Sequence, residues 1–115
     1  MILRNKDKES LIAIFNTTTC PFEVWAYGSR VNGDAHEGSD LNLVIRTPNL
    51  DKLPIDVYLN MKEQIQKSNI PIVVELFDWA RLPVYFQKNI EVNYEVLYNN
   101  MESILNEPPP EYGDS

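Results

Sequence analysis

Two short polar segments carry the residue types that bind a phosphate and a divalent cation. Gly28-Ser29 follows a stretch typical of a β-strand and precedes a stretch typical of a short helix. Glycine lets the backbone approach a ligand closely, and the free N–H groups at a helix start favour phosphate. Asp40 and Asn42 stand two residues apart at the entry to a second strand, so their side chains share a face. Oxygen-bearing side chains placed together in this way are the ligands that Mg²⁺ prefers.

Each segment also has a purely structural explanation. A Gly-Ser turn ends many strands without binding anything, and Asp-x-Asn is typical of a turn or cap. A third candidate, Glu75, lies inside the apolar run 72–77, so we expect it to be at least partly buried. An unpaired buried charge is costly, so Glu75 needs either a structural Arg or Lys or a metal ion. If its strand lies beside the strand of Asp40, Glu75 faces the same side as Asp40 and Asn42.

The segments that would position these residues alternate between helical and extended patterns. The apolar spacing predicts helices over 6–17, 55–67 and 84–105, with a break near Asn93 left open, and a short helix in the front half of 28–40. Strands are predicted over 22–27, 41–46 and 70–77. The last of these is an almost continuous apolar run, which is typical of a strand covered on both faces. This order predicts an α/β (α+β) fold, a small sheet with helices packed on it.

Composition and charge restrict the classes of function. The chain has 115 residues and a formal net charge of −7, and Cys20 is its only cysteine. We take residues 1–106 as one domain and the proline-rich segment 107–115 as a disordered tail. Free-standing nucleic-acid binding is not expected, because nucleic acid is usually gripped by Lys and Arg. No apolar run approaches the ~20 residues that span a bilayer, so no membrane contact is expected. The N-terminus lacks the apolar core of a signal peptide, and we expect a cytoplasmic protein.

The two polar segments together resemble the signature of the minimal nucleotidyltransferases, small relatives of kanamycin nucleotidyltransferase and DNA polymerase beta. The matching residues are Gly28-Ser29-Arg30-Val31-Asn32-Gly33-Asp34-Ala35 and Gly38-Ser39-Asp40-Leu41-Asn42-Leu43-Val44-Ile45. The family pattern is Gly-Ser, a spacer with an inner glycine, then Ser-Asp-hydrophobic-Asp-hydrophobic, with a third acid on a later strand. The similarity extends from the first predicted helix to the last.

The resemblance implies a nucleotidyltransferase fold, a mixed sheet with helices on one side, and a bound nucleotide. ATP or another nucleoside triphosphate would bind at Gly28 and Ser29, with Ser39 nearby. Arg30 would help to place the phosphates, and its alternative role is a solvated loop charge. His36, in the spacer, is expected to be an exposed loop residue.

The resemblance also implies a catalytic and metal-binding set. Mg²⁺ ions would be held by Asp40, Asn42 and Glu75, and Glu75 would help to activate the attacking hydroxyl. Two positions depart from the family pattern, because its second acid is Asn42 here and its third, usually aspartate, is Glu75. Loss of one oriented electrostatic stabiliser costs on the order of 10²–10³ in rate. Asp78 is not expected to replace the missing acid, because three residues beyond Glu75 it has the opposite strand parity unless the strand ends before it.

Two hypotheses about function follow, beside that of a globular protein unrelated to nucleotides. In the first, the chain is an active Mg²⁺-dependent nucleotidyltransferase that moves AMP from ATP to a hydroxyl, as antitoxin-like family members do on a helical HEPN-type toxin partner. In the second, Asn42 has impaired catalysis, and the chain is a binding module that works through a partner protein. Oligomer formation is compatible with both.

Overall fold

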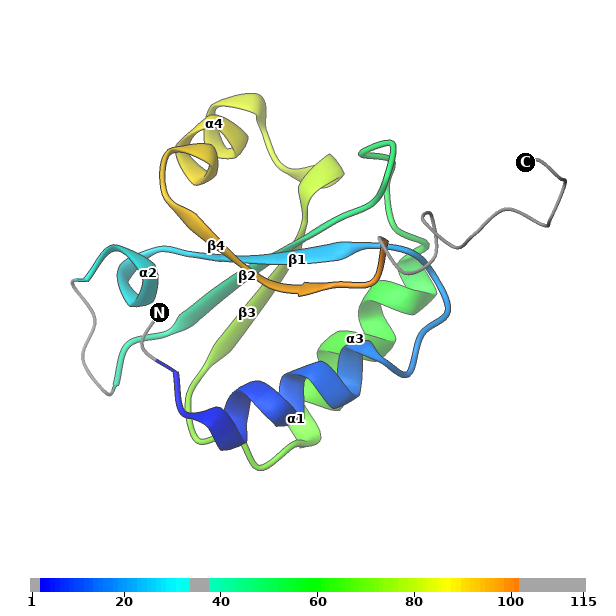
Figure 1. Cartoon of the computed structure of the whole chain (residues 1–115). Coiled ribbons are helices and arrows are strands. Elements are labelled where there is room, and N and C mark those ends of the chain that lie inside the picture. The colour runs from blue at the N-terminus through cyan, green and yellow to red at the C-terminus, as the bar shows by residue number, and fades with distance from the viewer. Residues whose placement is uncertain (1–2, 34–37, 102–115) are drawn as a thin grey trace, which may run out of the picture.

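The computed structural model describes residues 3–33 and 38–101, which form a mixed four-stranded sheet with helices packed on it (Figure 1). The helices are α1 (Asn5–Phe15), α2 (Ser29–Asn32), α3 (Ile55–Lys67) and α4 (Val84–Val92), with a short 3-10 helix, η1 (Trp79–Arg81). The strands are β1 (Glu23–Tyr27), β2 (Leu41–Arg46), β3 (Val74–Asp78) and β4 (Tyr94–Asn99). The bounds of β2 and α3 are those predicted from the sequence, and the short helix after Gly28 is α2.

The strands lie in the order β3-β2-β1-β4. β1 runs antiparallel to both β2 and β4, whereas β2 runs parallel to β3. A parallel pair needs a crossover connection, and α3 supplies it between β2 and β3. Because β2 has a strand on each side, its residues Leu41, Leu43, Val44 and Ile45 are fully buried.

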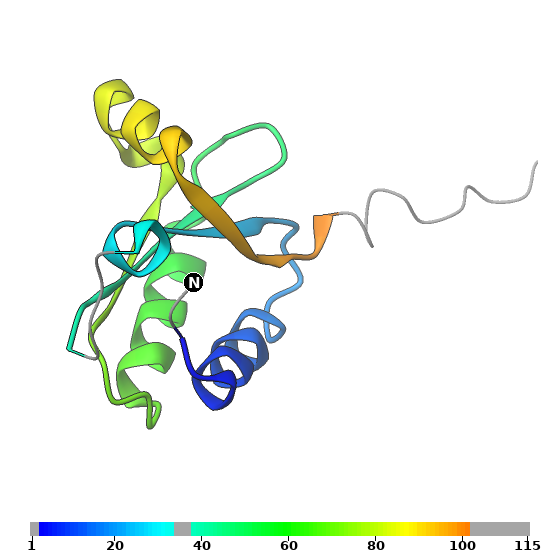
Figure 2. The same ribbon diagram turned by 60° about the vertical axis from the view of Figure 1, so that its left-hand side comes forward.

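Helices cover both faces of the sheet. α1 and α3 pack on one face, and α4 lies on the other (Figures 1 and 2). The first core includes Leu11, Phe15, Val24, Leu43, Ile45 and Met61. The second includes Trp25, Tyr27, Val44, Trp79 and Ile90. The expectation of helices on one side therefore holds for α1 and α3 but not for α4. The second face needs a cover because β1 and β2 present large apolar side chains on it.

The prediction of a helix over 84–105 is correct for its first part and wrong after Val92. The helix ends at Val92, Asn93 adopts an extended conformation, and Tyr94–Asn99 forms β4 against β1. Leu97 is buried in the first core, and the Tyr94 ring stacks on Trp25 with centroids 3.7 Å apart. The helix-like spacing of the apolar residues is thus overridden by strand pairing, which suits an aromatic and β-branched segment.

The third predicted strand starts later than expected and is not covered on both faces. It begins at Val74, after Pro71, and lies at an edge of the sheet. Val73 is 60% exposed, and the Glu75 side chain is also exposed. The prediction that Glu75 is partly buried is therefore wrong, because an edge strand borders solvent.

Three sequence predictions lie outside the described residues: the exposed position of His36, the disordered tail 107–115, and the fold of residues 102–106. In the part of the chain that is described, no helix is long and apolar enough to cross a membrane.

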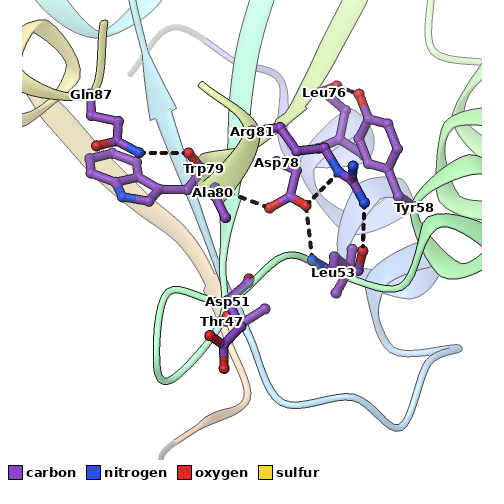
Figure 3. Close-up of polar contacts among 10 residues, drawn as sticks. All are labelled: Thr47, Asp51, Leu53, Tyr58, Leu76, Asp78, Trp79, Ala80, Arg81 and Gln87. Carbon is purple, nitrogen blue, oxygen red and sulfur yellow. Dashed lines mark hydrogen bonds and ion pairs between the residues drawn. The ribbon is translucent and has the colours of Figure 1, made fainter. Parts of the chain in front are cut away.

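A buried carboxylate ties the end of β3 to the segment before α3 (Figure 3). Asp78 is 2% exposed, and its Oδ2 accepts hydrogen bonds from Leu53 N at 2.9 Å and Arg81 Nε at 3.1 Å. Its Oδ1 accepts from Ala80 N at the start of η1. Arg81 Nη2 also donates to Leu53 O at 3.2 Å. The network fixes the direction in which the chain leaves β3 toward α4.

Replacing Asp78 by alanine should lower the free energy of unfolding by about 2–3 kcal/mol, since the buried Leu53 N–H loses its acceptor and Arg81 its ion partner. Urea denaturation measures this loss. The matched control is Glu63→Ala, which removes a carboxylate from the Glu63–Lys67 pair, whose side chains are 61% and 74% exposed. The control should cost less than about 0.5 kcal/mol. Equal losses in the two variants would contradict a structural role for Asp78.

Candidate functional site

Tyr27, Asn42 and Glu75 form a row across three strands. Asn42 of β2 is paired with Tyr27 of antiparallel β1 and with Glu75 of parallel β3. Directly paired residues project to the same face of a sheet, so the three side chains lie side by side. Asp40 precedes β2 by one residue and has the parity of Asn42. The fold therefore brings Asn42 and Glu75 side by side, as the sequence predicted, while the approach of Asp40 to Glu75 stays a prediction.

The Gly28 turn lies directly against this row. Gly28 has φ 89° and ψ −157°, a conformation that is essentially restricted to glycine. A Cβ atom at this position would stand 2.6 Å from Asn42 Nδ2, so only glycine lets the backbone come this close. The Gly28 carbonyl accepts hydrogen bonds from Val31 N and Asn32 N, both at 3.0 Å, and thereby starts α2. α2 thus begins at the end of the sheet where β1 ends and β2 starts (Figure 1).

Arg30 is a buried part of the site's framework. It is 4% exposed, so the alternative of a solvated loop charge is wrong. Its Nε donates to the carbonyl of Ser39 at 2.9 Å, across the spacer of the sequence signature. This bond joins α2 to the residue that precedes Asp40. Arg30 therefore holds together the two halves of the signature.

The three side chains predicted to bind the metal have no side-chain partner in the described structure. Asp40, Asn42 and Glu75 make no side-chain hydrogen bond or ion pair with any residue in 3–33 or 38–101. An ion pair between Glu75 and a Lys or Arg, the structural alternative, is not found among these residues. Within the same ranges, no three His, Cys, Asp or Glu side chains come together as a metal-binding group. Of the three residues predicted to bind the metal, Asp40 and Glu75 are acids and Asn42 is a neutral amide.

Tyr27 is a member of the row that the sequence did not single out. It is 9% exposed, and its hydroxyl has no hydrogen-bond partner in the described structure. Burial, and after it the negative charge of Glu75, raises the pKa of Tyr27 to about 12, so the phenol keeps its proton at neutral pH. The one available signal was its position, directly before Gly28 and with the parity that faces Asn42.

Asp78 lies on the opposite face of the sheet from Glu75. It pairs with Ile45, whose side chain belongs to the core under α1 and α3. Its carboxylate is occupied by Leu53, Ala80 and Arg81. Asp78 therefore does not replace the missing acid, as its strand parity predicts.

A cavity of about 230 Å³ lies away from this row, between α3 and the segment that follows α1. Its lining residues are Thr17, Thr18, Thr19, Val57, Asn60, Met61 and Gln64, none of which is charged. Its neutral hydroxyls and amides offer no carboxylate for the divalent cation that accompanies a triphosphate, so the row beside Gly28 is the better candidate for a nucleotide.

Known proteins share this chain's sequence pattern and fold. The family model described as polymerase beta, nucleotidyltransferase matches residues 9–103. A protein from Haemophilus influenzae named "Probable protein adenylyltransferase MntA" is 37% identical over 85 residues, which are 72% of this chain and 71% of that protein. A chain in a crystal structure of a toxin–antitoxin with AMP-PNP has a TM-score of 0.64 and 14% identity, covering 84% of this chain and 76% of its own. A Sulfolobus solfataricus protein assigned to the nucleotidyltransferases has a TM-score of 0.51 and 15% identity, over 80% and 76% of the two chains. The two structures are evidence of the fold.

Gly28→Ala should displace the Asn42 side chain, because the added Cβ would meet Asn42 Nδ2 at 2.6 Å. The strained backbone should also cost about 1–3 kcal/mol of stability. The shift of the Asn42 side-chain amide resonance in an NMR spectrum reports the displacement. Gly33→Ala is the matched control, since Gly33 has φ 93° but no atom within 4 Å of an added Cβ. It should lower stability and leave the Asn42 resonance in place; an equal shift in both variants would contradict the close approach.

Proposed function

Because the chain belongs to the polymerase beta family of nucleotidyltransferases, among its minimal members, we propose that it transfers AMP from ATP to a hydroxyl on a partner protein. The observation that carries this proposal is the row of Asn42 and Glu75 beside the Gly28 turn. The family supplies the type of reaction, and we assign that reaction to the row. The name of the Haemophilus influenzae relative supports AMP as the transferred group and a protein as the acceptor.

The oxygen atoms of Asp40 and of two residues of the row suit Mg²⁺ as ligands. Asp40 and Glu75 offer carboxylates and Asn42 an amide oxygen, and none is bonded to another described side chain. Mg²⁺ takes hard oxygen ligands and is usually bound through one or two carboxylates plus substrate phosphates. When bound, the metal would neutralise the triphosphate and polarise its α-phosphorus. We assign Asp40, Asn42 and Glu75 as its ligands.

We assign the Gly28 turn to the binding of the nucleotide's phosphates. The backbone of Gly28 approaches the row closely, and the Ser29 hydroxyl and N–H follow at the start of α2. Ser39 stands next to Asp40, and the buried Arg30 holds its carbonyl at 2.9 Å. We therefore give Arg30 a positioning role in nucleotide binding, through Ser39, in place of a direct contact with phosphate.

We assign Glu75 as the base that takes the proton of the attacking hydroxyl. Its carboxylate is exposed on the edge strand, so an acceptor can reach it from solvent. The acceptor oxygen forms a bond to the α-phosphorus, and the bond from that phosphorus to the oxygen bridging to the β-phosphorus breaks. Pyrophosphate leaves with the bridging oxygen, and the hydroxyl proton passes to Glu75.

We propose that the partner protein carrying the acceptor hydroxyl is a helical HEPN-type toxin. The structural neighbour from a toxin–antitoxin assembly with AMP-PNP supports both a partner protein and an adenine nucleotide. The net charge of −7 suits a partner with a basic surface.

A binding module is the second candidate, and Asn42 is the observation that favours it. With an amide in the second position, the described part of the chain lacks a cluster of three acids. Such a protein would keep the fold and the partner but transfer AMP slowly or not at all.

Thermal unfolding with ATP and Mg²⁺ tests the site. ATP and Mg²⁺ together, at ~100 times the dissociation constant, should stabilise the protein by about 2.7 kcal/mol, or several degrees in Tm. Either component alone should shift Tm much less. Asp40→Asn should abolish the shift, whereas Asp56→Asn, an exposed acid on α3, should preserve it. Absence of a shift in the wild type, together with a shift in Asn42→Asp, would favour the binding module.

Labelled AMP transfer tests the reaction. With a HEPN-type partner and α-labelled ATP, Asp40→Asn should slow labelling by on the order of 10²–10³-fold. Asn42→Asp restores a charged metal ligand and should accelerate labelling. Wild-type protein that binds Mg²⁺ and ATP without labelling the partner, while Asn42→Asp labels it, would show that catalysis is impaired in this chain.

A further inference from the structure

One polar group on the row has no role in the proposed reaction, the hydroxyl of Tyr27. It is buried without a hydrogen-bond partner among the described residues. A buried tyrosine hydroxyl usually finds a partner, and leaving a buried donor unpaired costs free energy. Such a group calls for an explanation, and a partner that is brought into place by a bound ligand is one.

The ring of Tyr27 is held in place. The Phe86 ring of α4 packs against it edge-on, with centroids 6.1 Å apart and planes at 90°. Phe86 also contacts Phe77 of β3, with centroids 6.3 Å apart. One side chain of α4 thus bridges the strands on either side of β2. The hydroxyl therefore has little freedom to move, and a partner must come to it.

The Glu75 carboxylate is a candidate for that partner. It lies on the same row, its carboxylate is exposed and unpaired within the described residues, and its charge acts on Tyr27. Asn42 stands between the two residues but turns its Nδ2 toward Gly28. A carboxylate is also a stronger acceptor for a hydroxyl than a neutral amide.

We propose that Tyr27 is a positioning residue, whose hydroxyl donates a hydrogen bond to the Glu75 carboxylate once Mg²⁺ and ATP occupy the site. The inference rests on the proposed function. Carboxylates that bind a metal are generally oriented by hydrogen bonds from neighbouring groups. In this chain the bond fixes a flexible glutamate, one methylene longer than the aspartate usual at this position.

Tyr27→Phe tests the inference in the full-length chain, by calorimetric binding of Mg²⁺ with a non-hydrolysable ATP analogue. Because no bond is lost in the free protein, its Tm should stay the same or rise. The affinity should fall by about tenfold, as expected for one hydrogen bond to a charged group. The matched control is Tyr98→Phe, since the Tyr98 hydroxyl donates to Asn16 Oδ1 at 2.8 Å and lies in the other core. It should lower Tm and leave the affinity unchanged.

A double-mutant cycle with Glu75→Gln identifies the partner. If Tyr27 acts through Glu75, Tyr27→Phe should weaken binding by less than about twofold in the Glu75→Gln background. An equal loss in both backgrounds would overturn the inference, because Tyr27 would then act independently of Glu75. A lowered Tm of Tyr27→Phe, or unchanged affinity, would overturn it too while leaving the proposed function intact. Wild-type protein that fails to bind the nucleotide would overturn both.

Discussion

The register of β2 with its two neighbours is the constraint on which the rest of the site depends. Because side chains alternate along a strand, a slip by one residue would turn Asn42 into the core beneath α1 and α3. The register is held by the buried residues Leu41, Leu43 and Ile45, which cannot face solvent without a large loss of apolar burial. The apolar core on one face thereby determines which polar side chains meet on the other. The Gly28 turn lies against the same face, since a Cβ at Gly28 would stand 2.6 Å from Asn42 Nδ2.

Farther along β2, on the same face of the sheet as Asn42, the guanidinium of Arg46 packs against aromatic rings. Arg46 lies over Trp25 at 3.9 Å and Trp79 at 4.5 Å from the ring centroids, and pairs with Glu23 at 3.1 Å. Its Nε lacks a hydrogen-bond acceptor among the described residues, because the guanidinium faces aromatic rings. Asn42 and Arg46 thus have opposite roles on one strand. Arg46 is enclosed by its neighbours, whereas Asn42 has no side-chain partner in the described structure.

The parts of this architecture that depend on local pattern were predictable, and those that depend on sheet order were not. β2 and α3 have strong apolar periodicity, and their bounds were predicted correctly. β4 was mistaken for helix because its apolar residues are spaced three or four apart, and its partner β1 lies far away in sequence. The exposure of Glu75 followed from the edge position of β3, which no local pattern encodes. The burial of Arg30 and the unpaired hydroxyl of Tyr27 depend on three-dimensional packing, so the sequence offered only their positions beside Gly28.

The amide of Asn42 changes what the site would recognise under the proposed function. A third carboxylate beside Asp40 and Glu75 would repel the other two in the metal-free protein, which already carries a net charge of −7. The amide removes that repulsion and also lowers the attraction for a free cation, since metal affinity depends on the charge of the ligands. Phosphate oxygens of the nucleotide can supply the missing negative charge. The row therefore suits a metal that arrives already bound to a triphosphate better than a metal that binds first. Under the proposed function, the binding of the nucleotide and the binding of the metal would then depend on each other.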